Sequence, residues 1–94
     1  MARAIWNEQV IAEPGSTEII EGNHYFPDVT LRKEFFRPSK KVTVCPWKRT
    51  AHYYTPSIAG KENADAAWYY PAPKAAASKI AGMVAFWKGV RIET

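Results

Sequence analysis

Turn-forming residues interrupt this sequence at short intervals, and most of the runs between them alternate apolar and polar side chains. Alternation with a period of two is typical of a half-buried β-strand, and Gly, Pro and Asn mark the ends of such strands. The predicted strands cover residues 4–7, 9–13, 17–21, 51–58, 61–70, 84–88 and 90–93. The expected fold class is therefore mainly β.

One hairpin, one helix and one irregular stretch complete this prediction. Residues 51–58 and 61–70 are predicted to pair as a long hairpin, because Gly60 supplies the positive φ that a two-residue turn at Ala59-Gly60 needs. Residues 74–81 are predicted to form one short helix, since alanines and Ile80 recur at helical spacing between a proline and Gly82. Residues 24–41 are expected to be loop with one short element.

The two faces of the predicted hairpin differ in chemistry. A turn at 59–60 or at 60–61 leaves the same side chains on the same face, because the two registers differ by an even number of residues. One face carries His52, Tyr54, Asp65, Ala67 and Tyr69, and the other carries Ala51, Tyr53, Ala64, Ala66, Trp68 and Tyr70. The alanine face is expected to receive a packed element such as the 74–81 helix, whereas the first face brings together titratable groups.

The size of the chain and its single cysteine bound the remaining possibilities. Ninety-four residues, 47% of them hydrophobic, supply one modest core, so residues 1–94 are expected to form a single domain, monomeric or in a small homo-oligomer. Cys45 alone cannot form an intrachain disulfide or a thiolate zinc site, and no metal or other cofactor is expected. No apolar run reaches the roughly 18 residues of a membrane span, so the prediction is a cytoplasmic protein without a membrane partner.

Charge is distributed unevenly along the chain. Residues 1–28 contain one arginine and five acidic residues, a net charge of −4. Residues 30–49 contain seven basic residues and one acidic residue, a net charge of +6, and the basic block runs from Arg32 to Arg49. Such a block either binds phosphates, as in nucleic acids, or forms a solvated face.

Asp65 and Cys45 are candidate site residues, each with a structural alternative. Aspartate is disfavoured inside strands, so Asp65 is expected to accept a hydrogen bond from Tyr54, His52, Lys48 or a loop amide, in a structural network or in a binding site. Cys45, close to Lys48, is either a thiolate nucleophile or inert packing. The sequence contains no catalytic triad order, phosphate-binding glycine loop or metal-ligand spacing.

Four strings in the chain resemble a known family. They are Cys45-Pro46-Trp47-Lys48, Ala51-x-Tyr53-Tyr54, Asp65-Ala66-Ala67-Trp68-Tyr69-Tyr70-Pro71 and Ile80-Ala81-Gly82-Met83-Val84-Ala85-Phe86. Together they resemble the small bacterial domain-of-unknown-function family 427. The resemblance implies a compact, tent-like antiparallel β fold of the Mss4-like kind without its metal cysteines. Arg49 stands where the family usually has glycine, so no sharp turn is expected at 49.

These observations favour a small-ligand-binding domain with a polar, aromatic cleft, and they leave open whether it is an enzyme. The expected cleft residues are Cys45, Trp47, Lys48, His52, Tyr54, Asp65 and Tyr69. The alternative is a nucleic-acid or polyanion-binding module that uses the basic 32–49 block with aromatic stacking surfaces. A third possibility is an interaction subunit whose aromatic surface is a homodimer interface.

Overall fold

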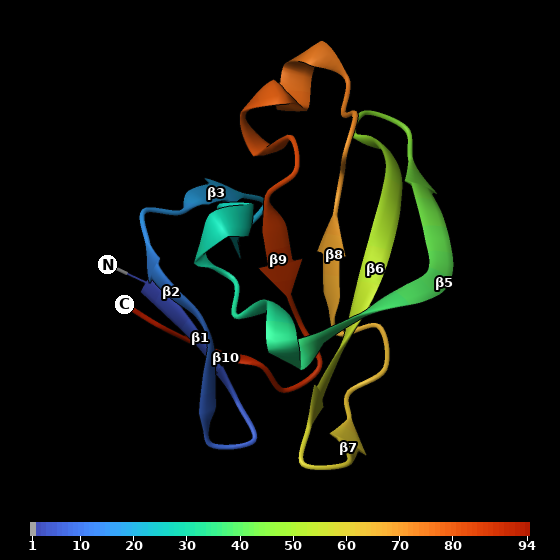
Figure 1. The fold of residues 1–94 in the computed structure, drawn as a ribbon. Helices are drawn as coiled ribbons and strands as arrows, with labels where there is room; N and C mark the ends of the chain where they lie inside the picture. Colours follow the sequence, from blue (N-terminus) through green and yellow to red (C-terminus); the bar gives the residue numbers. More distant parts are fainter. Residues whose placement is uncertain (1) are drawn as a thin grey trace.

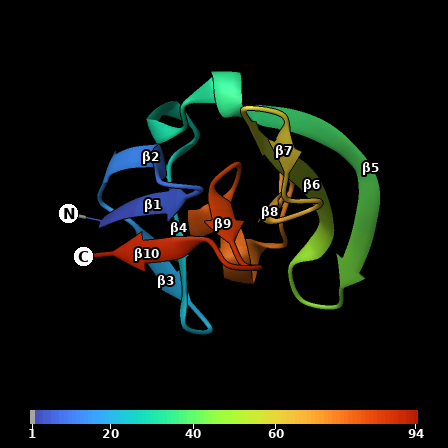
Figure 2. The same ribbon diagram turned by 90° about the horizontal axis from the view of Figure 1, so that it is seen from below.

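The two ends of the chain meet in a small antiparallel sheet. The structure, a computed structural model, describes residues 2–94. Strands β1 (Ala2–Trp6) and β2 (Gln9–Gly15) turn at Asn7-Glu8, where both residues have a positive φ, and β10 (Arg91–Glu93) pairs with the other edge of β1. The order is β10-β1-β2, and the termini lie side by side (Figures 1 and 2).

The larger sheet supplies most of the scaffold. Its order is β5-β6-β8-β9, formed by β5 (Phe36–Cys45), β6 (Arg49–Ile58), β8 (Ala67–Tyr69) and β9 (Val84–Phe86), with the short β7 (Lys61–Glu62) paired to the end of β6. Strand β5 curves along the outer edge of the molecule (Figure 2), and most of its residues are exposed. The terminal sheet packs against one face of strands β8 and β9, across a shared apolar cluster (Figure 1).

A small hairpin links the two sheets. Strands β3 (Glu18–Ile20) and β4 (Asn23–Tyr25) are joined by a two-residue turn at Glu21-Gly22, and both turn residues have a positive φ. Phe26, directly after β4, exchanges backbone hydrogen bonds of 2.7 and 2.8 Å with Val84. Two 3-10 turns, η1 (Asp28–Thr30) and η2 (Lys33–Phe35), then lead into β5. The hairpin is thereby fixed against β9.

Two apolar clusters occupy the two faces of the larger sheet. The first lies toward the terminal sheet and contains, among others, Ala4, Ile11, Phe26, Leu31, Ala67, Val84 and Phe86. The second lies on the other face, where the 3-10 helix η3 (Ala75–Ile80) packs, and contains Tyr25, Ala51, Tyr70, Ala77, Ile80 and Ala85. Each large side chain buried in this way contributes about 1.5–3 kcal/mol to folding. The sheet is stabilised from both sides.

The predicted mainly β, antiparallel fold is confirmed, and so is the turn at Ala59-Gly60, where both residues have a positive φ. The strand residues of the hairpin lie on the predicted faces, since His52 pairs with Tyr69 and Tyr53 pairs with Trp68. The helix predicted at 74–81 is present as the 3-10 segment η3, which has a kink at Ala77.

Three local predictions are wrong. Residues 24–41 do not form a loop with one element, because they contain part of β4, two 3-10 turns and the first half of the long strand β5. The predicted strand 61–70 is divided into β7 and β8 by a turn at residues 63–66. A sharp turn does occur at residue 49, because Arg49 closes the three-residue loop 46–48 with a φ of 80°.

Candidate functional site

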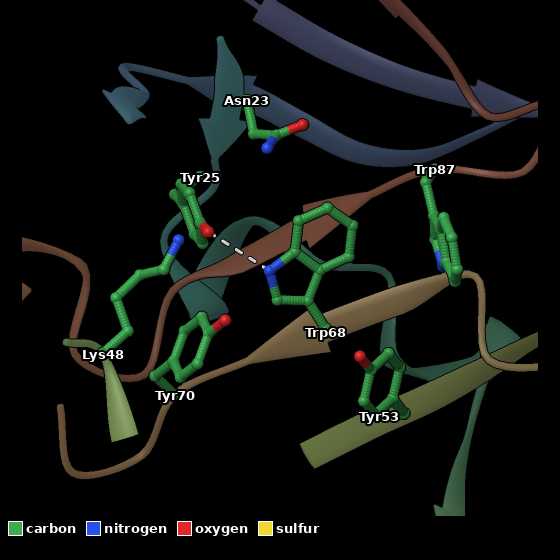
Figure 3. Close-up of a pocket in the computed structure, with 7 residues that line it drawn as sticks. All are labelled: Asn23, Tyr25, Lys48, Tyr53, Trp68, Tyr70 and Trp87. Carbon is green, nitrogen blue, oxygen red and sulfur yellow. Dashed lines mark hydrogen bonds between the residues drawn. The ribbon is translucent and has the colours of Figure 1, made fainter. Parts of the chain in front are cut away.

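An aromatic pocket of about 180 Å³ opens between the β3–β4 hairpin and the second face of the larger sheet. Figure 3 shows its lining side chains pointing toward a common space. They are Asn23, Tyr25, Lys48, Tyr53, Trp68, Tyr70 and Trp87. Alternation along β6 and β8 places Tyr53 and Trp68 on this face, and the tight loop 46–48 directs Lys48 inward.

Lys48 is a buried cation at one end of the pocket. The residue is 6% exposed, and its ammonium donates a hydrogen bond to the carboxylate of Glu21. Its Nζ lies 4.9 Å from the ring centroid of Trp47 and 5.6 Å from that of Tyr70. Burial alone lowers the pKa of Lys48, but the hydrogen bond to Glu21 and the nearby tyrosines outweigh burial and raise it. The amine is therefore a charged donor at neutral pH.

Tyr25 and Trp68 form the floor of the pocket. The Nε1 of Trp68 donates a hydrogen bond of 3.2 Å to the hydroxyl of Tyr25, and the two rings meet edge to face at 6.2 Å (Figure 3). Burial raises the pKa of Tyr25 and of Tyr70, although the neighbouring Lys48 lowers both. Both phenols therefore stay protonated at neutral pH, so their O–H groups remain available as donors.

Trp87 forms the outer rim and is held there by the turn at 63–66. Its Nε1 donates a 2.6 Å hydrogen bond to the backbone carbonyl of Asp65, and its backbone N–H donates to the carbonyl of Ala66. The ammonium of Lys88 lies 4.9 Å from the centre of the Trp87 ring. Trp87 meets Trp68 edge to face at 6.2 Å. These contacts hold the Trp87 side chain at the rim, even though Trp87 is 43% exposed.

The residues that were predicted to form one cleft are separated by the sheet. Lys48 lines the pocket, Trp47 packs over its ammonium, and Cys45 is partly buried against the second cluster. His52, Tyr54 and Tyr69 lie on the opposite face. There the ring of Tyr69 stacks on His52 at 5.7 Å and on Tyr54 at 4.9 Å.

Asp65 departs most from the prediction made for it. It lies in the 63–66 turn rather than within a strand, and its φ is 57°. Its carboxylate accepts a hydrogen bond from the hydroxyl of Ser39 on β5, not from Tyr54, His52 or Lys48. Its backbone N–H donates to Thr55 Oγ1 at 3.1 Å. Asp65 therefore contributes to the pocket indirectly, through the carbonyl that holds Trp87.

Six of the seven lining residues were not predicted to be site residues. Tyr53, Trp68 and Tyr70 were placed on the correct face, but that face was interpreted as packing surface only. The indole and phenol groups of these residues could have indicated a site, because Tyr and Trp are common on apolar binding surfaces that water reaches as well as in protein cores. Asn23, Tyr25 and Trp87 come from distant segments, and no local pattern connects them.

The pocket lining can recognise a molecule through flat aromatic walls and a few hydrogen-bond donors. Within residues 2–94, no three His, Cys, Asp or Glu side chains gather closely enough to hold a metal ion. No helix in the described part of the chain is both long and apolar enough to cross a membrane. The groups that can contact a bound molecule are thus aromatic faces, three phenols, an amide and an ammonium.

Comparison with known proteins identifies the family. No curated protein matches this chain. A family model described as a domain of unknown function, DUF427, matches residues 1–94. The match covers the strings that had indicated this resemblance, including the aromatic residues of β8 and the loop that carries Lys48. The chain therefore belongs to the DUF427 family.

Proposed function

We propose that this domain binds a small, planar, single-ring molecule in the pocket between Trp68 and Tyr70. The observation that carries the proposal is a cavity of about 180 Å³ that is walled by five aromatic side chains and contains one buried amine. A cavity of about 150 Å³ accommodates benzene, whereas drug-sized ligands occupy roughly 300 Å³ or more. The size of the pocket therefore favours one ring.

The polar atoms of the lining support binding in a fixed orientation. Lys48 at one end, the phenols of Tyr25 and Tyr70 beside it, and the amide of Asn23 offer donors at one side of the ring site (Figure 3). Because the pKa of Lys48 is raised, its amine is protonated and is not a nucleophile. The geometry therefore supports binding more directly than turnover.

A titration with single-ring compounds tests this function. The indole N–H resonances of Trp68 and Trp87 should shift saturably on addition of benzamide or benzoate. Trp87→Leu removes the outer aromatic wall and its hydrogen bond to the Asp65 carbonyl, so it should weaken binding at least fivefold and lower the unfolding temperature, and binding is compared well below that temperature. Val44→Ala, at a 76% exposed position on β5, is the matched control. Absence of any saturable shift across the panel would contradict the proposal.

Polyanion binding along β5 remains a second candidate with less support. Arg37, Lys40 and Lys41 are exposed on this edge strand, and Lys41 lies 5.4 Å from the ring centroid of Tyr53. Three other members of the basic block, however, pair with acidic side chains of the N-terminal segment: Arg32 with Glu13, Lys33 with Asp28 and Lys48 with Glu21. For single-stranded oligonucleotides bound through the three β5 cations, the logarithm of the binding constant would fall with the logarithm of salt concentration with a slope of about −2.

A further inference from the structure

The ion pair at the pocket joins a buried cation to an exposed anion. The side chain of Lys48 is 7% exposed, whereas that of Glu21 is 56% exposed. Glu21 occupies the tip of the β3–β4 hairpin, where its φ of 55° forms part of a two-residue turn. The carboxylate can therefore return to water at little cost, while the ammonium depends on an acceptor inside the pocket.

The surroundings of Lys48 leave room for a different acceptor. An ammonium has three donors, and the neighbours above it, the rings of Trp47 and Tyr70, attract a cation without accepting a strong hydrogen bond. The ammonium points toward Tyr25, and the phenols of Tyr25 and Tyr70 lie on the same side of the pocket (Figure 3). Burial keeps these phenols protonated, so they too can donate. A negatively charged oxygen group fits this cluster of donors.

We infer that the pocket selects ring compounds carrying a negatively charged oxygen group, and that Glu21 is an internal competitor which occupies Lys48 until such a ligand replaces it. This inference rests on the ligand-binding function proposed above. The ring packs in the pocket between Trp68 and Tyr70, with Trp87 at its outer rim, and its carboxylate or phosphate takes the place of the Glu21 carboxylate on the Lys48 ammonium. Because Glu21 lies at the exposed tip of the β3–β4 hairpin, its carboxylate can leave Lys48 without any rearrangement of the larger sheet.

The first test compares four single-ring probes on the unaltered protein. Benzoate, phenyl phosphate, benzamide and benzylammonium share the ring and differ in the charge of the substituent. Binding is followed by the indole N–H resonances of Trp68 and Trp87. At least one anion should bind about fivefold or more tighter than benzamide, and benzylammonium should bind most weakly. Preference for benzoate or for phenyl phosphate then separates a carboxylate ligand from a phosphate ligand.

The second test removes the internal competitor. Glu21→Gln should tighten the binding of the preferred anion about fivefold or more, because the ligand no longer displaces a carboxylate from the buried ammonium, and about 1 kcal/mol corresponds to that factor. It should leave benzamide binding unchanged. Glu18→Gln, an exposed position on the same hairpin, makes the same change in net charge and should have no effect on either probe.

The outcomes separate the inference from the function on which it rests. If benzamide binds as tightly as both anions, the selection of anions is overturned while the pocket stands. If Glu18→Gln and Glu21→Gln act alike, the competitor role of Glu21 is overturned while the pocket stands. If no ring compound shifts either indole resonance, both the inference and the proposed function fail.

Discussion

Arg49 has a backbone conformation that residues other than glycine rarely adopt. Its φ is 80°, in the left-handed region where the Cβ atom crowds the backbone, at a cost of about 1–2 kcal/mol. The residue is exposed and closes the loop that carries Lys48. Arg49→Gly should therefore raise the free energy of unfolding by about 0.5–1 kcal/mol, because relief of strain exceeds the entropy that glycine adds to the unfolded chain.

Urea unfolding of the unaltered protein, Arg49→Gly and Arg49→Ala checks this expectation. Arg49→Ala removes the charge but keeps the Cβ atom, so it should show none of the gain found for Arg49→Gly. Equal stability of both variants would mean that charge, rather than backbone strain, determines the effect at this position.

The turn at 63–66 acts as an element in its own right, because it sets both the start of β8 and the place of Trp87. Asp65 holds this turn through the Ser39 hydroxyl, a neutral donor. Asp65→Asn keeps an acceptor and tolerates the positive φ, so it should cost less than about 0.5 kcal/mol. Asp65→Ala loses both properties and should cost about 1–2 kcal/mol.

Chemical unfolding, followed by the fluorescence of the four tryptophans, measures these costs. Ser39→Ala removes this donor and also the acceptor of the Lys41 backbone N–H, and it should cost about 1–2 kcal/mol. An Asp65→Asn protein as unstable as Asp65→Ala would show that the charge itself is needed, in contrast to the neutral partner seen here.

Local patterns predicted elements well where packing agreed with them. Alternation and Gly60 correctly predicted the turn between β6 and β7. The predicted faces of His52 and Trp68 are also correct, although a turn at 63–66 interrupts the second strand. This turn shifts the pairing register by two residues, from Ser57–Glu62 to His52–Tyr69, and an even shift keeps each side chain on its face. Strand β5 was not predicted, since a strand exposed along both faces carries no alternation. Most of the pocket was missed because Asn23, Tyr25 and Trp87 join Lys48 only through tertiary contacts.

Across the whole molecule, folding brings segments of opposite charge together. The acidic N-terminal third supplies Glu13, Glu21 and Asp28, and each pairs with a residue of the basic block. The terminal strands are joined in the same way, since Arg3 donates to Glu93 at 2.9 Å and lowers the pKa of that carboxyl. Three of the seven basic side chains of the 32–49 block are therefore paired with carboxylates, and three others lie exposed on β5.

Buried titratable groups on both faces of the sheet make the fold sensitive to alkali. Burial, with Tyr69 adding to it, raises the pKa of Tyr54 to about 12, and the pKa values of Tyr25, Tyr70 and Lys48 are raised as well. In each case the unfolded chain releases its proton at a lower pH than the folded one. The stabilisation is thus fully present below about pH 10 and is lost as the pH rises toward 12.

Tyr54→Phe isolates the largest of these contributions. The unaltered protein should lose stability between pH 10 and pH 12, and Tyr54 should account for on the order of 2 kcal/mol of that loss. The variant can differ in stability at neutral pH, so the quantity to compare is the change in unfolding free energy between pH 9 and pH 12, measured with urea. Its loss should be smaller by about that amount, because phenylalanine has no proton to release. An identical alkaline loss in both proteins would show that the Tyr54 phenol ionises in the folded state as readily as in the unfolded chain, and that its burial against Tyr69 and Phe36 is not maintained in solution.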